Sequence, residues 1–400
     1  MKVGVAAYRF DYYSYIRNIV GIIPGVQYQK AKDLIARVNA GVRLLNRIAR
    51  REIISTFDLN NQFYDLNLNK VDLLHLFNGI SYGRTHWVST FETILPRFRS
   101  VVQLTRRTDH ELEKDWKLRR AFEALAGPHC KKIIAISACT ANMQRVLLDE
   151  FSRYKEEIEE KLVVMHPPQD LLVSQFEDKQ VDLTGQVKFM FVGNAFFRKG
   201  GVEIIDTMKM LRDQYHYELE LTVVSDLRAD GYAVPVDSDT IQHTRAILQD
   251  NRDWINYYPQ LPNTQVLELM KKAHIGLLPT YADTYGYSVL EFQAAGCPVI
   301  TTNVRSLPEI NDNERGWMID VPKNHLGEAI YTTASDRNTI STTICAGLEK
   351  AVHEIFADRS IIPQKSAEAI LNITANHSKA DFSSKSKSSS SQSKCLIPYL

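Results

Sequence analysis

The sequence contains little cysteine, and nothing in it resembles a structural metal site. Five cysteines are spread along 400 residues, form no CxxC pair, and have no histidine at metal-ligand spacing. A disulfide framework needs regularly spaced cysteines, and a zinc site needs clustered cysteine and histidine. We therefore expect free thiols, a reducing compartment and no bound metal. The cysteines are Cys130, Cys139, Cys297, Cys345 and Cys395.

Long apolar runs are also absent. No stretch approaches the roughly 18 apolar residues that suggest a membrane-spanning helix. The first apolar segment, KVGVAAY, is too short for a secretory leader. The sequence thus predicts a cytoplasmic protein without a membrane-spanning helix.

The chain as a whole lacks an excess of charge of one sign, because its net charge is only +1. This balance gives no reason to expect a nucleic-acid partner. The two parts of the chain differ, however. Residues 1–150 hold 23 Lys and Arg against 14 Asp and Glu, or +9, which leaves −8 for the remainder. The basic part either faces an anionic partner or is a solvated surface, and the sequence leaves both interpretations open.

Short apolar segments alternate with amphipathic ones along most of the chain. This rhythm predicts an α/β protein with two Rossmann-like, doubly wound parallel-sheet domains that face a cleft. We expect an N-terminal domain over 1–178, a second domain over 179–357, a C-terminal helix over 358–378 that packs back on the first domain, and a disordered tail over 379–400. The expected strands are KVGVAAY, DLLHLFN, RSVVQLT, KKIIAIS and KLVVMHPP, then KFMFVG, ELELTVVS, WINYYP, HIGLLP, PVITT and GWMID.

The stretch DTYGYSVLEFQAAGCPVI carries two acids, Asp283 and Glu291, across a strand-to-helix loop. Such loops lie at the carboxyl ends of parallel strands, where ligands of α/β folds bind. Free amides around Gly286, Tyr287 and Ser288 suit an anion at the helix N-terminus. Glu291 suits two vicinal hydroxyls of a ribose, and Asp283 suits a further sugar hydroxyl. The alternative is an ordinary βαβ unit whose two acids are solvated.

A second candidate phosphate loop, FVGNAFFRKGG, follows the first strand of the second domain. Gly193 permits a close turn there. Arg198 and Lys199 put positive charge at the start of the next helix, which suits a diphosphate. The alternative is a glycine turn with two exposed basic residues.

These residues resemble the retaining nucleotide-sugar glycosyltransferases of glycosyltransferase family 4, which have the GT-B fold. The resemblance covers roughly residues 188–319. It implies that Lys199 binds the donor diphosphate, Glu291 the ribose and Asp283 the transferred sugar, and that the loop with Tyr258 and Leu261 contacts the nucleobase. The matching positions are Gly193, Lys199, Gly200, Pro279, Asp283, Gly286, Glu291, Ala294, Gly296, Pro298, Val299, Ile300, Pro308, Glu309 and Ile310.

The sequence departs from the family pattern at four places. Asp283 stands where glutamate is usual. Asn194 replaces a common arginine, which Arg198 would compensate. The glycine pair after the first strand is missing. Glu92 stands where the family often has a histidine, and we expect it to orient the acceptor. The resemblance implies transfer from a nucleotide diphosphate sugar to a glycan or lipid-linked acceptor, in cell-surface polysaccharide or glycolipid synthesis, without a cofactor. Alternatives are a nucleotide-sugar epimerase, a phosphorylase, or a catalytically degenerate sugar-binding protein of the same fold.

Two further segments have a plain and a functional interpretation. Residues 30–52 form a basic amphipathic helix of charge +5, which either packs on its own sheet or contacts the inner face of an anionic membrane. The apolar face is expected to comprise Ala31, Leu34, Ile35, Val38, Val42, Leu45 and Ala49, opposite Arg37, Arg43, Arg47, Arg50 and Arg51. Asp237 and Asp239 could hold a divalent ion, but their polar loop favours a solvated turn.

Overall fold

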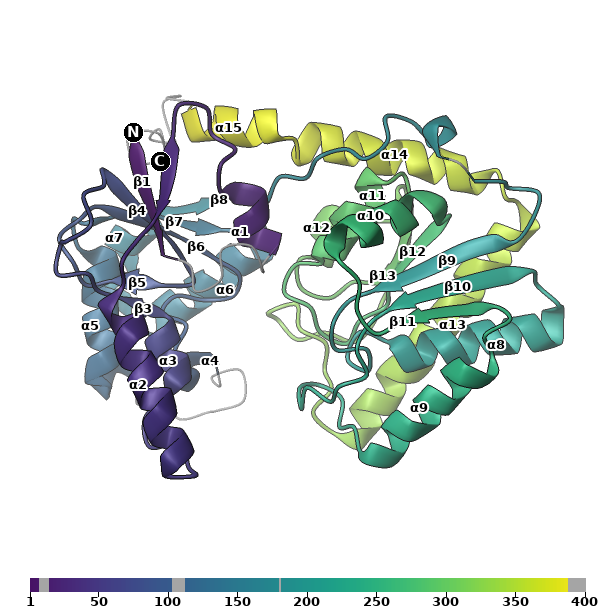
Figure 1. Cartoon of the computed structure of the whole chain (residues 1–400), viewed down its shortest axis with the longest axis horizontal. Helices are drawn as coiled ribbons and strands as arrows, with labels where there is room; N and C mark the ends of the chain where they lie inside the picture. Colours follow the sequence, from purple (N-terminus) through teal and green to yellow (C-terminus); the bar gives the residue numbers. More distant parts are fainter. Residues whose placement is uncertain (7–13, 103–111, 180, 388–400) are drawn as a thin grey trace. The chain divides into compact units, whose positions relative to one another are not determined.

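The computed structural model describes residues 1–6, 14–102, 112–179 and 181–387 (Figure 1). The chain forms two compact units. Unit 1 consists of Met1–Pro168 and the chain from Lys379, and unit 2 consists of Gln169–Ser378. Unit 2 begins before the expected residue 179 because the segment after Pro168 already bonds to it. The amide of Gln169 donates to the His377 carbonyl and that of Leu172 to the Ala294 carbonyl, both at 2.8 Å.

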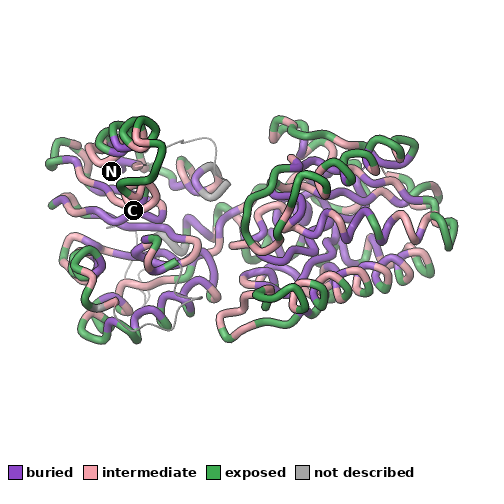
Figure 2. The backbone as a smooth tube through the Cα atoms, turned by 90° about the horizontal axis from the view of Figure 1, so that it is seen from below, coloured by how far each residue is buried: buried purple, intermediate pink, exposed green. Residues whose placement is uncertain are grey.

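Unit 1 is built on a six-stranded, entirely parallel sheet of order β2-β1-β4-β6-β7-β8. A small second sheet pairs β3 with β5. The central strands are almost wholly buried, as expected of strands covered on both faces (Figure 2). The strands are β1 (Lys2–Ala6), β2 (Gln27–Lys30), β3 (Gln62–Phe63), β4 (Leu73–Phe77), β5 (Ile80–Ser81), β6 (Trp87–Phe91), β7 (Cys130–Ala135) and β8 (Leu162–Val164).

The helices of unit 1 connect these strands. Several begin with a capping side chain, such as Asp33 before α2 and Ser137 before α6, whose oxygens accept first-turn amides. The helices are α1 (Ser14–Ile19), α2 (Leu34–Ile48), α3 (Thr56–Asn60), α4 (Arg99–Val102), α5 (Trp116–Ala126), α6 (Ala138–Asp149), α7 (Lys155–Glu159) and α15 (Lys379–Lys387).

Unit 2 contains a second parallel six-stranded sheet, of order β11-β10-β9-β12-β13-β14. Its strands are β9 (Val187–Val192), β10 (Leu219–Val224), β11 (Ile255–Tyr258), β12 (Ile275–Leu278), β13 (Val299–Thr302) and β14 (Gly316–Ile319). Its helices are α8 (Gly201–Tyr215), α9 (Ser238–Asp250), α10 (Asn263–Lys272), α11 (Tyr287–Ala294), α12 (Leu307–Ile310), α13 (Ala334–Ala357) and α14 (Ile361–Asn376). All six strands expected in this domain are confirmed.

Each sheet has one point where the winding direction reverses. In unit 1 the chain runs from β1 to β2 on one side and later continues with β4 on the other side of β1. In unit 2 it runs from β9 through β10 to β11, then continues with β12 on the other side of β9. The loops after the two strands at such a reversal diverge and leave a crevice at the carboxyl edge of the sheet, where ligands bind.

One predicted strand of unit 1 is wrong. RSVVQLT contains helix α4, and its last three residues lie outside the described residues. The fourth strand in chain order of the large sheet is β6, in the segment HWVSTF, and neither β6 nor β2 was among the predicted strands. Ser89 and Thr90 interrupt the apolar pattern of β6, yet both are buried. Ser89 donates to the Gly79 carbonyl at 2.8 Å, and the Thr90 hydroxyl bonds to Nε2 of His75 at 2.8 Å.

The C-terminal helices also differ from the prediction. The segment expected to pack on the first domain, 358–378, contains α14, which contacts α11 and β14 of unit 2. The amide of Asn372 there donates to the Gln293 side chain at 2.9 Å. The chain joins unit 1 only at α15, where the prediction had placed a disordered tail. Phe382 of α15 is buried in a cluster that includes Val3, Val5 and Ile134. Residues 388–400 of the expected tail lie outside the described residues.

Across the described residues, none of the helices combines the length and the apolar character that crossing a bilayer requires.

Phe382→Ala is expected to lower the free energy of unfolding of unit 1 by about 3 kcal/mol, because it leaves a cavity in a buried cluster. Leu371→Ala, at a side chain 57% exposed on α14, should change it by less than about 0.5 kcal/mol. Urea unfolding of both variants measures the difference. Equal effects would contradict the packing of α15 on unit 1.

Candidate functional site

Two loops of unit 2 converge at the reversal point of its sheet, one after β9 and one after β12. The Nζ atom of Lys199, from the first loop, lies 3.1 Å from Oδ2 of Asp283, from the second. Both side chains are mostly buried, 16% and 11% exposed. The structure thus brings together two predicted site residues that are far apart in the sequence, at the edge of the sheet where ligands bind.

Gly193 shapes the first loop. A Cβ atom at this position would lie 2.8 Å from both Cδ and Nζ of Lys199, closer than real side-chain contacts allow. The Lys199 side chain therefore packs directly against the backbone of Gly193. The Gly193 amide donates to the Val224 carbonyl at 3.1 Å, and the Ser225 hydroxyl donates to the Gly193 carbonyl. Asn194 follows on the same loop with an exposed side chain.

Asp283 is held as an anion. Its Oδ1 accepts the amides of Tyr285 and Gly286 at 3.1 and 2.9 Å. Burial raises the pKa of this carboxyl, but the charges of Lys199 and Arg198 and the hydrogen bonds it accepts outweigh that effect, so the pKa lies below 3.8. Asp283 therefore carries its negative charge at neutral pH.

Arg198 is less available to bind a diphosphate than the sequence suggested, because its guanidinium already has partners within the protein. Its Nε lies 2.6 Å from Oδ2 of Asp230, and its guanidinium also donates to the Ala282 carbonyl and lies 5.7 Å from the ring centre of Tyr232. Asp230 and Tyr232 come from the loop after β10, and the sequence offered no signal for either beyond a polar turn. Of the two basic residues, Lys199 is the one whose charge faces Asp283 directly.

The N-terminus of α11 lies on the same loop as Asp283. Gly286 takes φ = 90° as the residue before the helix, a backbone conformation that favours glycine. Tyr287 and Ser288 form the first turn, whose amides have no intrahelical acceptor. The Ser288 hydroxyl is buried and has no hydrogen-bond partner in the described part of the chain. This end of α11 therefore suits an anion or a hydroxyl-rich ligand.

Glu291 lies one turn into α11 and is 8% exposed. Its Oε1 accepts a hydrogen bond from the amide of Asn263 at 3.3 Å. Asn263 begins α10 and was not among the predicted site residues, although it closes the loop expected to contact a nucleobase. Its amide fixes one carboxylate oxygen and thereby orients Glu291.

Three further residues were predicted for the site, Tyr258 and Leu261 for the nucleobase and Glu92 for the acceptor. Tyr258 and Leu261 line a shallow pocket of about 360 Å³ with side chains of α10, including Gln265 and Glu268. Glu92 belongs to unit 1 and directly follows β6. Its amide donates to the Asn78 side chain at 3.0 Å, and its carbonyl accepts from the Thr140 hydroxyl at 3.1 Å.

Asp237 and Asp239, which were considered as ligands of a divalent ion, lie at the start of α9. Asp237 caps α9, and its carboxylate accepts the Thr240 amide at 2.7 Å. Within the described ranges, no group of three or more His, Cys, Asp or Glu side chains has the geometry to hold a metal ion.

Comparison with known proteins finds a match to the family "Glycosyl transferases group 1" over residues 174–343. A glycogen synthase of Mycobacterium tuberculosis is 26% identical over 146 residues, covering 36% of this chain and 33% of that protein. A D-inositol 3-phosphate glycosyltransferase of Streptomyces avermitilis is 23% identical over 194 residues, covering 43% and 38%. The matched part of this chain thus spans 33% and 38% of these relatives' lengths. The family match falls on unit 2.

Solved structures resemble the whole chain. WaaG, a glycosyltransferase involved in lipopolysaccharide biosynthesis, matches with a TM-score of 0.55 at 14% identity, covering 94% of this chain and 95% of that one. HepE of Anabaena, in complex with UDP, matches with a TM-score of 0.56 at 11% identity, covering 96% and 98%. Together with the two parallel sheets, these similarities confirm the predicted fold class, GT-B.

Asp283→Asn is expected to lower the free energy of unfolding at pH 7 by about 1–3 kcal/mol, because it leaves Lys199 without its carboxylate. A carboxyl whose folded pKa lies below 3.8 stabilises the fold above that pH, and this contribution is lost as the pH falls through the folded pKa. The difference between wild type and variant should therefore shrink between pH 5 and pH 2, which urea unfolding across this range measures. Asp213→Asn, at a solvent-facing pair with Lys209, is the control and should cost less than about 0.5 kcal/mol. A difference that grows in acid would contradict the assignment.

Proposed function

We propose that the protein is a retaining glycosyltransferase, which moves a sugar from a nucleotide diphosphate sugar to an acceptor hydroxyl. The observation that carries the proposal is the contact of Lys199 with Asp283 beside the N-terminus of α11. A cation and helix amides suit a diphosphate, while a neighbouring anion suits sugar hydroxyls. The match of residues 174–343 to group 1 glycosyl transferases supports the same activity. The intact pair of Lys199 and Asp283 also argues against the alternative of a catalytically degenerate sugar-binding protein.

Catalysis in this proposal is mainly electrostatic. When the bond between the sugar and the diphosphate breaks, negative charge grows on the leaving phosphate. Lys199 and the first-turn amides around Tyr287 and Ser288 stabilise that charge, and they need little rearrangement because the fold already holds them in position. Arg198, which forms an ion pair with Asp230, adds positive electrostatic potential to the site. No divalent ion or other cofactor is required.

The donor is oriented by two carboxylates in this scheme. Glu291 accepts the two ribose hydroxyls, with Asn263 holding its Oε1 in place. Asp283 accepts a hydroxyl of the transferred sugar through Oδ2, which lies 3.1 Å from Lys199, because its Oδ1 already accepts two backbone amides. The resemblance to family 4 enzymes implies that the acceptor hydroxyl attacks the sugar on the same face from which the diphosphate leaves. The leaving phosphate then takes the proton of that hydroxyl. Glu92 of unit 1 then orients the acceptor.

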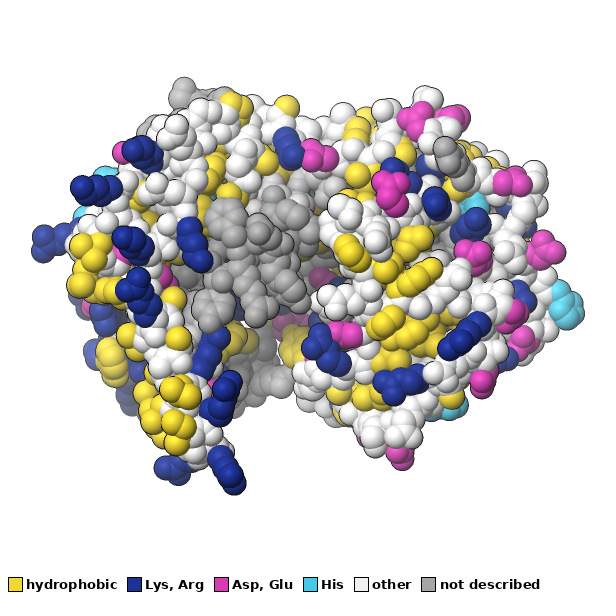
Figure 3. Space-filling model, viewed as in Figure 1, with side chains coloured by type: hydrophobic (Ala, Val, Ile, Leu, Met, Phe, Trp, Pro, Cys, Tyr) yellow, Lys and Arg dark blue, Asp and Glu magenta, His cyan; other side chains and the backbone are white. Residues whose placement is uncertain are grey.

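The acceptor is proposed to be a glycan or a lipid-linked molecule at the inner face of a membrane. Helix α2 supports this, because its apolar residues are only partly covered. Val42 is buried, but Val38, Leu44, Leu45 and Ile48 are 58%, 56%, 44% and 72% exposed. Figure 3 shows apolar and basic side chains intermixed over this helix. An exposed surface that is both apolar and basic fits the interface of an anionic bilayer.

Lys199→Ala is expected to lower kcat by about 100-fold, with a smaller effect on donor affinity, because the charge it meets grows in the transition state. Transfer from a panel of nucleotide diphosphate sugars, measured with EDTA present, tests this. Lys209→Ala, at a solvent-facing lysine of the adjacent helix α8, is the matched control and should leave kcat unchanged. A requirement for magnesium, or full activity in Lys199→Ala, would refute the mechanism.

The triple variant Arg47→Gln, Arg50→Gln, Arg51→Gln is expected to bind vesicles of phosphatidylglycerol at least tenfold more weakly than wild type. Each basic residue near an anionic surface contributes about 1 kcal/mol, and salt screens that contribution. Co-sedimentation at low and high salt measures binding, with phosphatidylcholine vesicles as the neutral reference.

The control for this experiment removes the same charge from the same unit, at exposed positions away from α2: Lys70→Gln, Arg84→Gln, Lys117→Gln. Unaltered binding of the α2 variant, or an equal loss in the control, would leave α2 as a structural helix and the acceptor as a soluble glycan.

A further inference from the structure

The two loops that carry Lys199 and Asp283 are bonded to each other beside the site. Arg198 directly precedes Lys199. Its carbonyl accepts the amide of Tyr281 at 2.9 Å and the hydroxyl of Thr280 at 3.2 Å. Tyr281 in turn lies two residues before Asp283. These hydrogen bonds therefore join the backbone next to the lysine to the backbone next to the carboxylate, and they limit how far apart the two charged groups can lie.

The start of α8 lies against the same pair of loops. A Cβ atom at Gly200 would lie only 2.1 Å from the carbonyl oxygen of Pro279, so the two backbones are in direct contact there. Helix α8 begins with the next residue, Gly201. A side chain in the first turn of this helix is therefore well placed to reach the loop that follows β12.

Glu203 occupies the first turn of α8 and reaches that loop with a buried carboxylate. The residue is 6% exposed. Its Oε1 accepts the hydroxyl of Tyr281 at 2.5 Å and the hydroxyl of Ser341 at 2.8 Å. Ser341 belongs to α13, which packs beside α8 (Figure 1). A single oxygen atom thus connects the start of α8, the loop after β12 and α13.

The environment of Glu203 is unfavourable for a carboxylate. Burial raises the pKa of this carboxyl, and the hydrogen bonds from Tyr281 and Ser341 offset only part of that rise, to which the charge of Asp206 adds. The Oε2 atom of Glu203 has no hydrogen-bond partner in the described part of the chain. A buried acceptor without a partner costs free energy, and an apolar side chain of similar size costs less. The stability of the fold therefore gives no reason for an acid at this position.

We propose that Glu203 is a positioning residue for sugar transfer, which acts through the phenol of Tyr281. The inference rests on the proposed function, because the residues that it positions are those that meet the donor. A carboxylate binds a hydroxyl more strongly than a neutral acceptor does, so it holds the Tyr281 ring and the loop that follows firmly. Asp283 on that loop then stays opposite Lys199, and neither group has to move when negative charge grows on the leaving phosphate.

The alternative is that Glu203 only helps to pack α8 against α13. Both helices already bury apolar side chains, such as Met208 on α8 and Ile344 on α13. A packing role predicts a loss of stability that is unrelated to the chemical step. A positioning role predicts a loss of turnover that depends on Lys199, so kinetic measurements distinguish the two.

Tyr281→Phe removes the hydroxyl that Glu203 binds and keeps the buried ring. It is expected to lower kcat about tenfold and to change the KM for the donor less than about threefold, because misplaced charges matter most in the transition state. Steady-state transfer from the best donor of a nucleotide diphosphate sugar panel measures both constants. Circular dichroism at the assay temperature verifies that the variant is folded.

Replacement of Glu203 tests the same contact from the other side. Glu203→Gln keeps the shape of the side chain and an acceptor oxygen, although a weaker one. Glu203→Ala removes the acceptor altogether. The glutamine variant should therefore keep a higher kcat than the alanine variant and a lower kcat than wild type. Wild-type kcat in both folded variants would contradict the positioning role.

A double-mutant cycle repeats Tyr281→Phe in the Lys199→Ala background. If Tyr281 acts through Lys199, the two changes remove one effect, and Tyr281→Phe should lower kcat by less than about threefold in this background. A packing role would lower kcat by the same factor with and without Lys199. An equal factor in both backgrounds would therefore overturn the inference.

Tyr217→Phe is the matched control, because it removes a hydrogen-bonded hydroxyl from a second tyrosine of unit 2. Its hydroxyl bonds to Nδ1 of His353 at 2.8 Å, and it precedes β10 at the opposite edge of the sheet from the site. It should leave kcat unchanged, and an equal loss of kcat in this control would also overturn the inference. A wild-type protein that transfers sugar from no donor of the panel would refute the proposed function and this inference together. Transfer by the wild type with unaltered kcat in Tyr281→Phe would refute the inference alone.

Discussion

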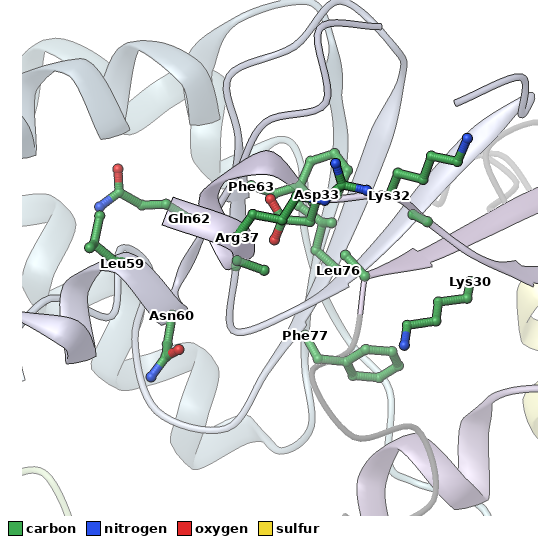
Figure 4. Close-up of a pocket in the computed structure, with 14 residues that line it drawn as sticks. Lys30, Lys32, Asp33, Arg37, Leu59, Asn60, Gln62, Phe63, Leu76 and Phe77 are labelled. Atoms are coloured by element: carbon green, nitrogen blue, oxygen red, sulfur yellow. The ribbon is translucent and has the colours of Figure 1, made fainter. Parts of the chain in front are cut away.

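All strands of a parallel sheet end at the same edge, and this constraint determines where chemistry can be assembled in the molecule. At one point in each sheet the chain reverses its winding direction, so the loops after two neighbouring strands diverge and leave room. In unit 2 those loops follow β9 and β12, and they deliver Lys199 and Asp283 to within 3.1 Å. In unit 1 a pocket lined by the last residues of β1, β2 and β4 lies at the corresponding edge of the sheet (Figure 4). The position of the Lys199 and Asp283 site thus follows from the winding order rather than from any single residue.

Much of this could be predicted because the signals are local. The strands of unit 2 are continuous apolar runs, each closed by a polar or glycine-containing turn, and all six were found from the sequence. The prediction that Lys199 and Asp283 serve one ligand also needed only the strand-to-helix rhythm and the expected loop positions. What could not be predicted was the partner that occupies Arg198, because Asp230 lies in a polar loop whose path no periodicity indicates.

Two of the failures in unit 1 involve the burial of polar residues, whereas β2 was missed because its segment QYQK is polar and mostly exposed. Strand β6 was missed because buried Ser89 and Thr90 break the apolar pattern while satisfying their hydrogen bonds internally. Seven apolar and alanine residues of 30–52 were placed on one helix face, with packing on the sheet and contact with a membrane both left open. The packing of α2 instead depends on Val42 and on Asn39, whose side-chain amide donates to the Thr56 carbonyl and the Asn60 side chain. A helical wheel that assigns Asn to the solvated face cannot find such an arrangement, and it likewise cannot show that Leu44 and Ile48 stay exposed.

The return of α15 to unit 1 makes the first unit discontinuous in the sequence, while unit 2 is one uninterrupted segment. During synthesis a ribosome therefore completes the sequence of the second unit before it has supplied the last element of the first. Until Phe382 emerges, the cluster around Val3, Val5 and Ile134 lacks one of its walls and exposes apolar surface. The last element of the first unit can therefore pack in place only after the sequence of the second unit is complete. Completion of the first unit follows that of the second in the order of synthesis, although the first unit begins to be made earlier.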